Sequence, residues 1–396
     1  MKVAVLFDRF GPYHIARLEA AAKYVEVIPV EVSGETNEYQ WDKVESAILK
    51  NRVTLFANKD SREIPSPELI KTLTQALDLL KPDVVAVNGW YDRSALSALY
   101  WSLENKIPAV VMSESAAGDE KRIWWKELLK KNIVKHFAAG LVGGSRHADY
   151  LKDLGMPPAH IFMGYDVVDN NHFKRTADEA REQKQKWQQQ HNLPENYFLV
   201  VSRFIPKKNL AFIIHAYHNY YQQMQEQAWH LLMLGDGPLK PELLELTNQL
   251  GLTNHIRFDG FKQYHELPIY FGLAKTFVHA STTEQWGLVV NEAMAAGLPV
   301  VISERCGCVP ELVHNGVNGF AINPEDQPAL TQIMLNLTNG TYNPEKMGEE
   351  SRRIVGHLDA DLFGKGLMQA ATVAVQTPVT KGSLAIKWLL KFLLKR

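Results

Sequence analysis

Short runs of apolar residues alternate with longer stretches of helical pattern along most of the chain. In the first half the runs are rich in β-branched residues, and helical stretches such as 15–23 and 94–104 separate them. Strands that are apolar throughout, with helices between them, predict a parallel sheet covered on both faces. The strands expected in the first half are 3–5, 25–32, 84–87, 109–112, 140–142 and 161–163.

The second half repeats this alternation. Two such series predict two doubly wound α/β domains, the first at 1–174 and the second at 197–357. A polar, Gln-rich segment at 175–196 reads as a linker with a solvated helix. Ligands of such sheets bind beyond the carboxyl ends of the strands, and two facing domains hold the ligand in the cleft between them. The helices expected in this half are 210–225, 239–250 and 288–296, and the strands are 198–202, 230–234, 256–258, 276–279 and 299–302.

Composition narrows the class of protein. The 396 residues carry 43 Lys and Arg against 44 Asp and Glu, and this net charge of −1 argues against a nucleic-acid-binding protein. The two cysteines, Cys306 and Cys308, are too few for a disulfide framework, and we interpret them as small residues in a turn. The first apolar run is too short for a signal peptide, and no apolar run reaches the roughly 20 residues of a membrane span. We therefore expect a cytoplasmic protein.

The loops that follow predicted strands carry candidate phosphate-binding groups. Gly11 precedes a helix, where backbone amides can approach a phosphate, although a plain strand-to-helix turn would look the same. The absence of a GxGxxG pattern there argues against a dehydrogenase. Arg203 and Lys208 follow the strand at 198–202, and two cations at that edge suit a diphosphate; a solvated basic loop is the alternative. Gly235 lies in a tight turn after the next strand, which turn chemistry alone would also explain.

The most informative segment contains two carboxylates eight residues apart. Glu284 is expected in the loop after a strand, and Glu292 on the helix that begins nearby. Glu292 can accept hydrogen bonds from two neighbouring hydroxyls such as those of a ribose, and Glu284 can reach a group beyond the phosphates. Burying carboxylates without binding partners in so apolar a segment costs free energy, which favours a ligand-binding role. Carboxylates with a purely structural role remain the alternative. The amides free at the helix start, where the dipole favours a phosphate, are those of Gly287, Leu288 and Val289.

This segment resembles the E-x7-E signature of the retaining GT-B glycosyltransferases, the large family typified by sucrose-phosphate synthase and bacterial mannosyltransferases. The resemblance covers most of the chain, and the pieces occur in the family's order and spacing. They are PDVVAVNG at 82–89, the segment 145–155, VDNNHF at 168–173, Ser202-Arg203 with Lys208, and GDGP at 235–238.

The resemblance implies a GT-B fold and a role for each matched residue. Arg203 and Lys208 would hold the diphosphate of a UDP- or GDP-linked sugar and balance charge on the leaving nucleotide. Glu292 would bind the ribose, and Glu284 would contact the transferred hexose. The amides around Gly11 and at the start of the second-domain helix would complete the phosphate cradle. Transfer would retain the anomeric configuration.

The family also uses no metal or other cofactor, because the cations and the helix dipole take that role. Its fold implies that a helix near Phe363 crosses back, so that residues from about 358 to 396 pack on the first domain. The chain departs from the family at Glu114, which stands where a histidine is usual, and this leaves the sugar open. His14 is a candidate substitute near the sugar or acceptor, and a structural histidine at a helix start is the alternative.

The C-terminal segment 381–396 has five basic residues, no acidic residue and a nearly continuous apolar face. This pattern predicts a helix that lies on an anionic membrane surface, with docking onto the protein as the alternative. The basic, Trp-rich segment 121–135 is a second candidate, with a solvated helix as the alternative. We therefore expect an enzyme at the inner face of the membrane that glycosylates a lipid-linked or membrane-presented glycan in surface polysaccharide or lipopolysaccharide synthesis. The alternatives are a non-catalytic nucleotide-sugar or glycan binding protein and a nucleotide-sugar 2-epimerase.

Overall fold

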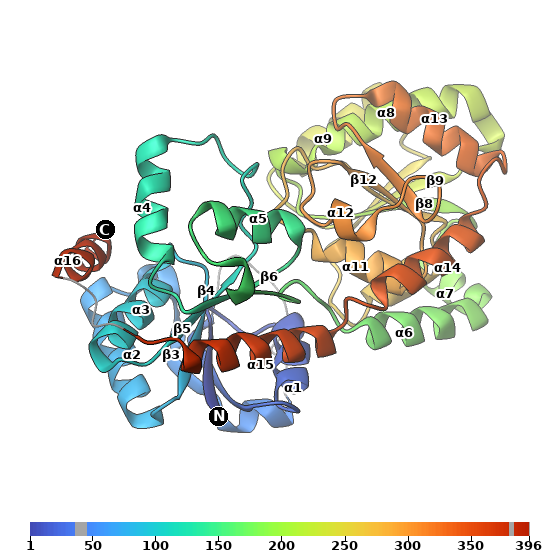
Figure 1. Ribbon diagram of the computed structural model, residues 1–396. Helices are drawn as coiled ribbons and strands as arrows, with labels where there is room; N and C mark the ends of the chain where they lie inside the picture. Colours follow the sequence, from blue (N-terminus) through green and yellow to red (C-terminus); the bar gives the residue numbers. More distant parts are fainter. Residues whose placement is uncertain (36–45, 380–383, 396) are drawn as a thin grey trace. The chain divides into compact units, whose positions relative to one another are not determined.

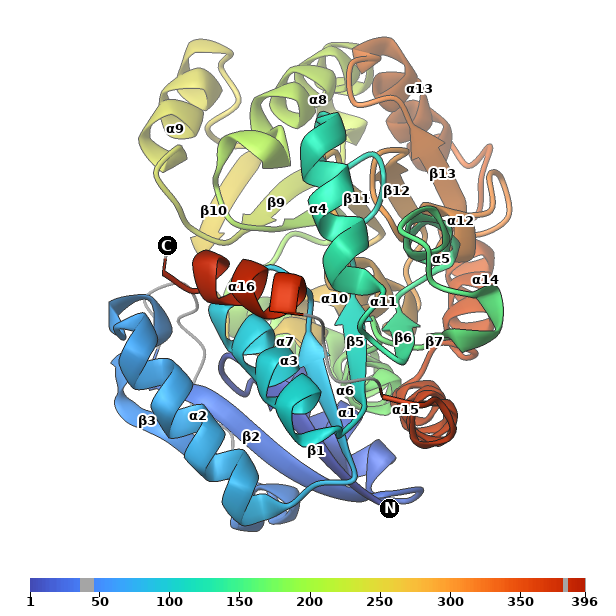
Figure 2. The same cartoon turned by 60° about the vertical axis from the view of Figure 1, so that its left-hand side comes forward.

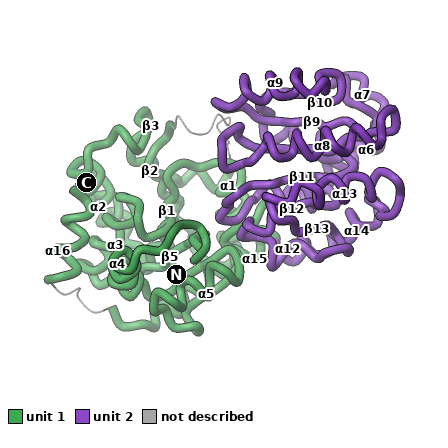
Figure 3. Tube along the Cα trace, turned by 90° about the horizontal axis from the view of Figure 1, so that it is seen from above, with its two compact units in different colours: residues 1–168, 359–396 green, residues 169–358 purple. Residues whose placement is uncertain are grey.

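The computed structural model describes residues 1–35, 46–379 and 384–395, which form two compact units (Figures 1 and 3). Unit 1 consists of Met1–Val168 and Asp359–Arg396, and unit 2 of Asp169–Leu358. Each unit is built around one parallel sheet, as the two series of apolar runs predict. None of the helices in these described ranges is long and apolar enough to cross a membrane.

The sheet of unit 1 has the strand order β3-β2-β1-β4-β5-β6-β7. Alternate strand residues face a core shared with α2, α3, α5 and α16, while the residues between them, such as Val3 and Val5, are also buried. Both faces of the sheet are therefore covered (Figure 2). The strands are β1 (Lys2–Phe7), β2 (Glu26–Glu35), β3 (Val53–Asp60), β4 (Val84–Asn88), β5 (Ala109–Ser113), β6 (Ala139–Val142) and β7 (Ile161–Met163). The helices are α1 (Pro12–Ala21), α2 (Ser66–Leu80), α3 (Arg93–Asn105), α4 (Trp124–Val134), α5 (Ser145–Asp153), α15 (Ala360–Gln376) and α16 (Leu384–Leu393).

The two C-terminal helices pack on unit 1, which confirms the crossing-back that the resemblance implies. α15 packs along α1 and contacts β6 and β7. Glycine permits this close approach, because a Cβ atom at Gly364 would lie 2.7 Å from the carbonyl oxygen of Ala20. α16 packs on α3, where Lys387 forms an ion pair with Glu104 at 2.5 Å.

The sheet of unit 2 has the order β10-β9-β8-β11-β12-β13, and all of its pairings are parallel. Its strands are β8 (Tyr197–Val201), β9 (His230–Leu234), β10 (Ile256–Gly260), β11 (Thr276–His279), β12 (Val300–Ser303) and β13 (Gly319–Ile322). Its helices are α6 (Asn170–Glu182), α7 (Lys184–His191), α8 (Leu210–Met224), α9 (Lys240–Gln249), α10 (Leu267–Leu273), α11 (Leu288–Ala295), α12 (Val309–Leu312), α13 (Gln327–Thr338) and α14 (Pro344–Val355).

The sequence analysis does not predict two of the strands, β3 and β13. Both lie at the edge of a sheet: β3 carries polar, exposed residues that break the apolar run, and β13 is only four residues long with two partly exposed positions. Edge strands need apolar residues only where they face the core.

The segment expected to be a linker, 175–196, lies instead mostly in α6 and α7 of unit 2. The physical reason is a narrow buried stripe, Phe173, Ala177 and Ala180, on an otherwise polar helix. α6 packs closely on α10, because Gly272 has no Cβ atom; one there would lie 2.7 Å from the carbonyl oxygen of Ala177. The polar composition of this segment therefore reflects a half-exposed helix.

Candidate active site

The strand order of unit 2 reverses between β8 and β11, which are neighbours although β9 and β10 follow β8 in the chain. Doubly wound sheets bind ligands at the carboxyl ends of the strands at such a switch point. The loops after β8 and β11 meet there, because the amide of Thr282 donates a hydrogen bond to the carbonyl oxygen of Lys207 at 2.8 Å. This contact brings together the cationic segment and the carboxylate segment that the sequence analysis singled out.

The carboxylate of Glu284 lies at the centre of this site. It forms an ion pair with Lys208, and both side chains are nearly buried, with exposed fractions of 13% and 12%. The ammonium of Lys207 lies 3.6 Å from the other carboxylate oxygen. The hydroxyl of Ser281 donates to the carboxylate at 3.3 Å, and the ring nitrogen Nε2 of His279 lies 3.5 Å from it. Glu284 is therefore held by groups from two loops and from the end of β11.

Electrostatics keep Glu284 ionised. Burial favours its neutral form, but the hydrogen bond from His279 and the charge of Lys208 outweigh burial and hold its pKa well below the usual range. Burial lowers the pKa of His279, so the ring is neutral at pH 7. Burial also lowers the pKa of Lys208, although Glu284 opposes the shift. The ammonium group of Lys208 is costly to desolvate, so a second anionic partner such as a phosphate would stabilise its charged form.

Arg203 follows β8 and is exposed at the same edge of the sheet. Its loop is fixed by neighbouring amides: that of Ser202 donates to Leu234 at 3.0 Å, and that of Phe204 donates to Asp236 at 2.8 Å. Gly235 makes this close approach possible, because its φ is +131° and a Cβ atom there would lie 1.8 Å from the carbonyl oxygen of Ser202. The amide of Gly235 donates to Gly260 within the fold. The structure thus places Gly235 as a support for the Arg203 loop.

Helix α11 begins at the same edge, directly after the Glu284 loop. Gly287 caps it with a φ of +102°, a conformation that favours glycine. The first amides of a helix have no partner within the helix, and those of Leu288 and Val289 lie at half-exposed positions here. Trp286 anchors the turn, because its buried indole nitrogen donates to the side chain of Asn291 at 2.9 Å. The helix start is therefore built as the sequence analysis expects.

Glu292 lies on α11 and is buried. Burial, together with the charge of Glu292, raises the pKa of Tyr264 well above its usual value, so the two side chains lie near one another. Tyr264 stacks on His172 with ring centres 4.7 Å apart. The sequence analysis missed Lys207, His279, Ser281 and Tyr264 as neighbours of the two carboxylates; only the adjacent lysine pair gave a local signal for one of them.

In unit 1 the backbone amides of the loop after β1 donate hydrogen bonds to side chains of the same unit. The amide of Gly11 donates to Nδ1 of His14 at 3.0 Å, and that of Phe10 donates to the carboxylate of Glu31 at 2.7 Å. A phosphate bound by the Gly11 amide would therefore have to displace His14. Burial and the charge of Arg17 lower the pKa of His14 to about 3, so the ring is neutral. These contacts match the structural alternative for His14.

The remaining candidates lie in both units. Glu114 follows β5 at the carboxyl edge of the unit 1 sheet, half-buried, with a hydrogen bond to Asp166. Cys306 and Cys308 are buried free thiols in the turn after β12, where the amide of Gly307 donates to the carbonyl oxygen of Glu284 at 2.9 Å. Among the residues that the structure describes, no group of three or more His, Cys, Asp or Glu is placed to hold a metal ion.

Residues 181–354, which make up most of unit 2, match the family model described as glycosyl transferases group 1. The matched residues include Arg203, Lys208, Glu284 and Glu292, the residues of the site described above.

Curated relatives match over part of their length. The chain is 29% identical over 154 residues to the alpha-monoglucosyldiacylglycerol synthase of Acholeplasma laidlawii, a match that covers 39% of this chain and 37% of the relative. It is 33% identical over 148 residues to the amylovoran biosynthesis glycosyltransferase AmsK of Erwinia amylovora, covering 36% of each. The chain thus spans little more than a third of each of these two relatives.

Solved structures match over nearly the whole chain. HepE of Anabaena in complex with UDP has a TM-score of 0.73 at 19% identity, covering 94% of this chain and 100% of that structure. The same protein has also been solved with UDP-glucose. At this identity the likeness shows the fold alone, and it confirms the expected pair of Rossmann-like units of GT-B type.

Proposed function

We propose that this chain is a retaining glycosyltransferase that moves a hexose from a UDP- or GDP-linked donor and uses no metal. The observation that carries the proposal is the clustering of Lys208, Lys207 and Glu284 beside the start of α11, at the switch point of a glycosyl transferases group 1 unit. The UDP and UDP-glucose complexes of HepE support a nucleotide-sugar donor, and UDP over GDP.

Each group of the site has a role in this reaction. Arg203 and Lys208 hold the diphosphate and stabilise the negative charge that moves onto it as the glycosidic bond breaks. The amides at the start of α11 add the positive end of a helix dipole. Glu292 binds the ribose hydroxyls, and Glu284, ionised and held by its neighbours, contacts the transferred sugar. The leaving phosphate takes the proton of the attacking hydroxyl on the same face, so the configuration is retained.

The acceptor in this proposal is lipid-linked or is a glycan presented at an anionic membrane surface. Helices α4 and α16 both pack against one core of unit 1 (Figure 2) and leave aromatic side chains outside, with Trp124 78% and Trp388 74% exposed. Exposed tryptophans among lysines suit a membrane interface. The names of the Acholeplasma laidlawii and Erwinia amylovora relatives support an acceptor in glycolipid or polysaccharide synthesis. Residues 380–383 and 396 of the basic tail lie outside the described residues.

Calorimetric binding of UDP, GDP and ADP in EDTA tests the donor site. The wild type is expected to bind one diphosphate with micromolar affinity, and Arg203→Ala to weaken it by 10-fold or more, which is about 1.4 kcal/mol. Arg175→Ala is the control, because that exposed arginine of α6 forms an ion pair with Glu179 on its own helix. Equal affinity of wild type and Arg203→Ala for the nucleoside diphosphate would show that Arg203 does not bind the diphosphate. Release of the nucleoside diphosphate from a bound nucleotide sugar then separates an enzyme from a binding protein.

A further inference from the structure

A buried contact between an arginine side chain and an aspartic acid side chain lies in unit 1. Arg17 of α1 and Asp166 of the loop after β7 have exposed fractions of only 3% and 1%, and their nearest charged atoms are 3.8 Å apart. The Nε atom of Arg17 donates to the carbonyl oxygen of Val167 at 3.1 Å. Its Nη2 atom is buried and has no hydrogen-bond partner among the described residues. An unpaired N–H of a buried guanidinium costs free energy unless something binds it.

The carboxyl group of Asp166 shares a hydrogen bond with that of Glu114. Two carboxyl groups can form such a bond only if one of them carries a proton. Burial, followed by the charge of Glu114, raises the pKa of Asp166 well above its usual value, although Arg17 opposes the shift. The raised pKa favours the neutral form of Asp166, which then donates the shared hydrogen bond to Glu114 at a half-buried position.

The surrounding residues are arranged to hold this pair. A Cβ atom at Gly143 would lie 2.1 Å from a carboxyl oxygen of Asp166, so glycine after β6 makes room for it. The guanidinium of Arg17 lies 5.0 Å above the ring of Tyr165, whose hydroxyl donates to Asn88 at the end of β4. The carboxyl ends of β4, β5 and β6 thus converge on the pair, and ligands of doubly wound sheets bind at this edge.

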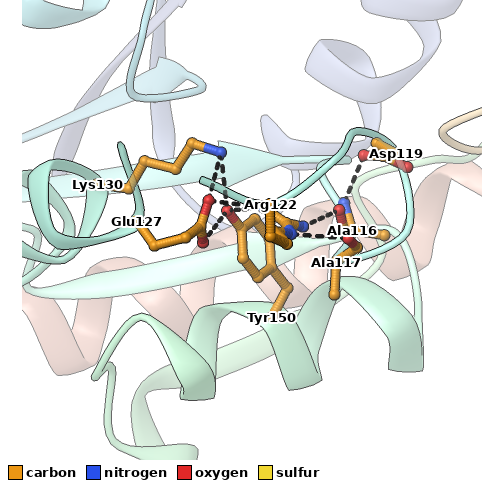
Figure 4. Close-up of polar contacts among 7 residues, drawn as sticks. All are labelled: Ala116, Ala117, Asp119, Arg122, Glu127, Lys130 and Tyr150. Atoms are coloured by element: carbon orange, nitrogen blue, oxygen red, sulfur yellow. Dashed lines mark hydrogen bonds and ion pairs between the residues drawn. The ribbon is translucent and has the colours of Figure 1, made fainter. Parts of the chain in front are cut away.

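The loop that begins with Glu114 is also fixed at its far end, as Figure 4 shows. Arg122 donates to the carbonyl oxygens of Ala116 and Ala117 at 2.6 and 2.7 Å, and to the carboxylate of Glu127 at 3.0 Å. It also donates to the hydroxyl of Tyr150, which donates to Glu127 in turn at 2.9 Å. These contacts join the loop that follows Glu114 to α4 and α5.

We propose that Glu114 and the Arg17–Asp166 pair form a hydroxyl-binding subsite for the acceptor in unit 1. Glu114 accepts the hydrogen bond of an acceptor hydroxyl, and Asp166 and Arg17 are positioning residues. A carboxylate accepts hydrogen bonds from hydroxyl groups, and among Glu114, Asp166 and Arg17 only Glu114 lies at a partly exposed position. A site built to pair a hydroxyl discriminates strongly against analogues that lack one. This inference rests on the proposed glycosyltransferase function.

The test uses glycerol as the probe, because it is a small polyol that needs no membrane. The full chain is incubated with UDP-glucose and glycerol, and the products are separated into free glucose, from hydrolysis, and glucosylglycerol. The ratio of the two reports acceptor binding, while total UDP release and the affinity for UDP report the donor site. The wild type is expected to favour glycerol over water, and Glu114→Gln to lower the ratio about 10-fold or more with unchanged UDP affinity.

Asp166 gives a sharper readout, because its proton makes it a hydrogen-bond donor. Asp166→Asn keeps a donor toward Glu114 and is expected to retain the ratio within about 3-fold, whereas Asp166→Ala loses it. An ionised Asp166 serving only as a salt-bridge partner would give a different result, with both variants equally impaired. Glu120→Gln, an exposed carboxylate on the same loop, is the matched control.

The outcomes are distinguishable. Normal UDP release with a ratio that Glu114→Gln leaves unchanged would overturn the subsite alone. A wild type that binds UDP but transfers glucose only to water would also overturn the subsite, since a hydroxyl subsite must prefer a polyol. A wild type that binds no nucleotide sugar would overturn the proposed function and this inference together. If a variant is destabilised but still folds, the unfolding free energies of Glu114→Gln, Asp166→Asn and the double variant test the contact between the two carboxyl groups, and additive values would contradict that contact.

Discussion

Replacing Lys208 with alanine is expected to lower the free energy of unfolding by about 2 kcal/mol at pH 7. Two unit charges about 4 Å apart attract by about 4 kcal/mol at the effective dielectric constant of a protein, and breaking a fully buried pair costs about 3–5 kcal/mol. Glu284 is nearly buried but keeps Lys207 at 3.6 Å and the hydroxyl of Ser281 at 3.3 Å. These partners reduce the loss to roughly half of the buried-pair value.

Urea unfolding monitored by tryptophan fluorescence measures this free energy. Lys207→Ala is the matched control, because that lysine is 38% exposed and its ion pair with Glu284 is longer. A partly exposed ion pair of this kind contributes less than about 1 kcal/mol to the free energy of unfolding. Equal losses for the two lysine variants would refute the central position assigned to the Lys208 contact. The Lys208 variant should also bind UDP more weakly, and the control should change the affinity less.

The pH dependence gives a second check. The pKa of Glu284 is held below its usual value. A carboxyl group whose pKa is lowered by folding contributes stability that is present above its unfolded pKa and is lost as the pH falls through the folded value. Lys208→Ala raises the pKa of Glu284 and so removes part of this contribution. The gap between wild type and variant should be constant near pH 7, begin to narrow as the pH falls through the pKa of Glu284 in the variant, and close only below the wild-type pKa, which lies well below the usual carboxyl range. A gap that is constant with pH would show that the lysine stabilises by packing alone.

Three further outcomes are expected. Glu292→Ala should weaken UDP binding by 10-fold or more in calorimetry through loss of the ribose contact, and unchanged affinity would remove it from the donor site. Gly235→Ala should lower the unfolding free energy by about 2–4 kcal/mol, because a Cβ atom meets a backbone oxygen at 1.8 Å, whereas Gly251→Ala, with φ of +69° and open space, should cost about 1 kcal/mol. Trp388→Ala should reduce sedimentation with phosphatidylglycerol vesicles and leave the already weak sedimentation with phosphatidylcholine vesicles unchanged. Equal vesicle binding by the wild type and Trp388→Ala, with the exposed Leu79→Ala of α2 as control, would contradict membrane docking through α16.

The sequence by itself determined the strands that are buried on both faces. The runs at 230–234 and 276–279 coincide with β9 and β11, because a central parallel strand has no polar face and reads as a continuous apolar run. It also identified the loops of the candidate site, since Lys208, Glu284 and the glycine before α11 lie in local patterns of a few residues. Such a local pattern can be recognised from the sequence alone, because it does not depend on residues that are distant in the chain.

Only the tertiary structure decided the edge strands, the partners of Glu284 and the cluster around Asp166. Edge strands and α6 bury a narrow stripe, so their composition resembles that of loops and linkers. The contact of Lys208 with Glu284 spans 76 residues, and that of Arg17 with Val167 spans 150. Such contacts arise because the carboxyl ends of parallel strands meet at one edge of a sheet, which brings together loops that are distant in the chain. The sequence shows which residues can carry a charge. The order of the strands determines which of these residues meet in a hydrogen bond or an ion pair.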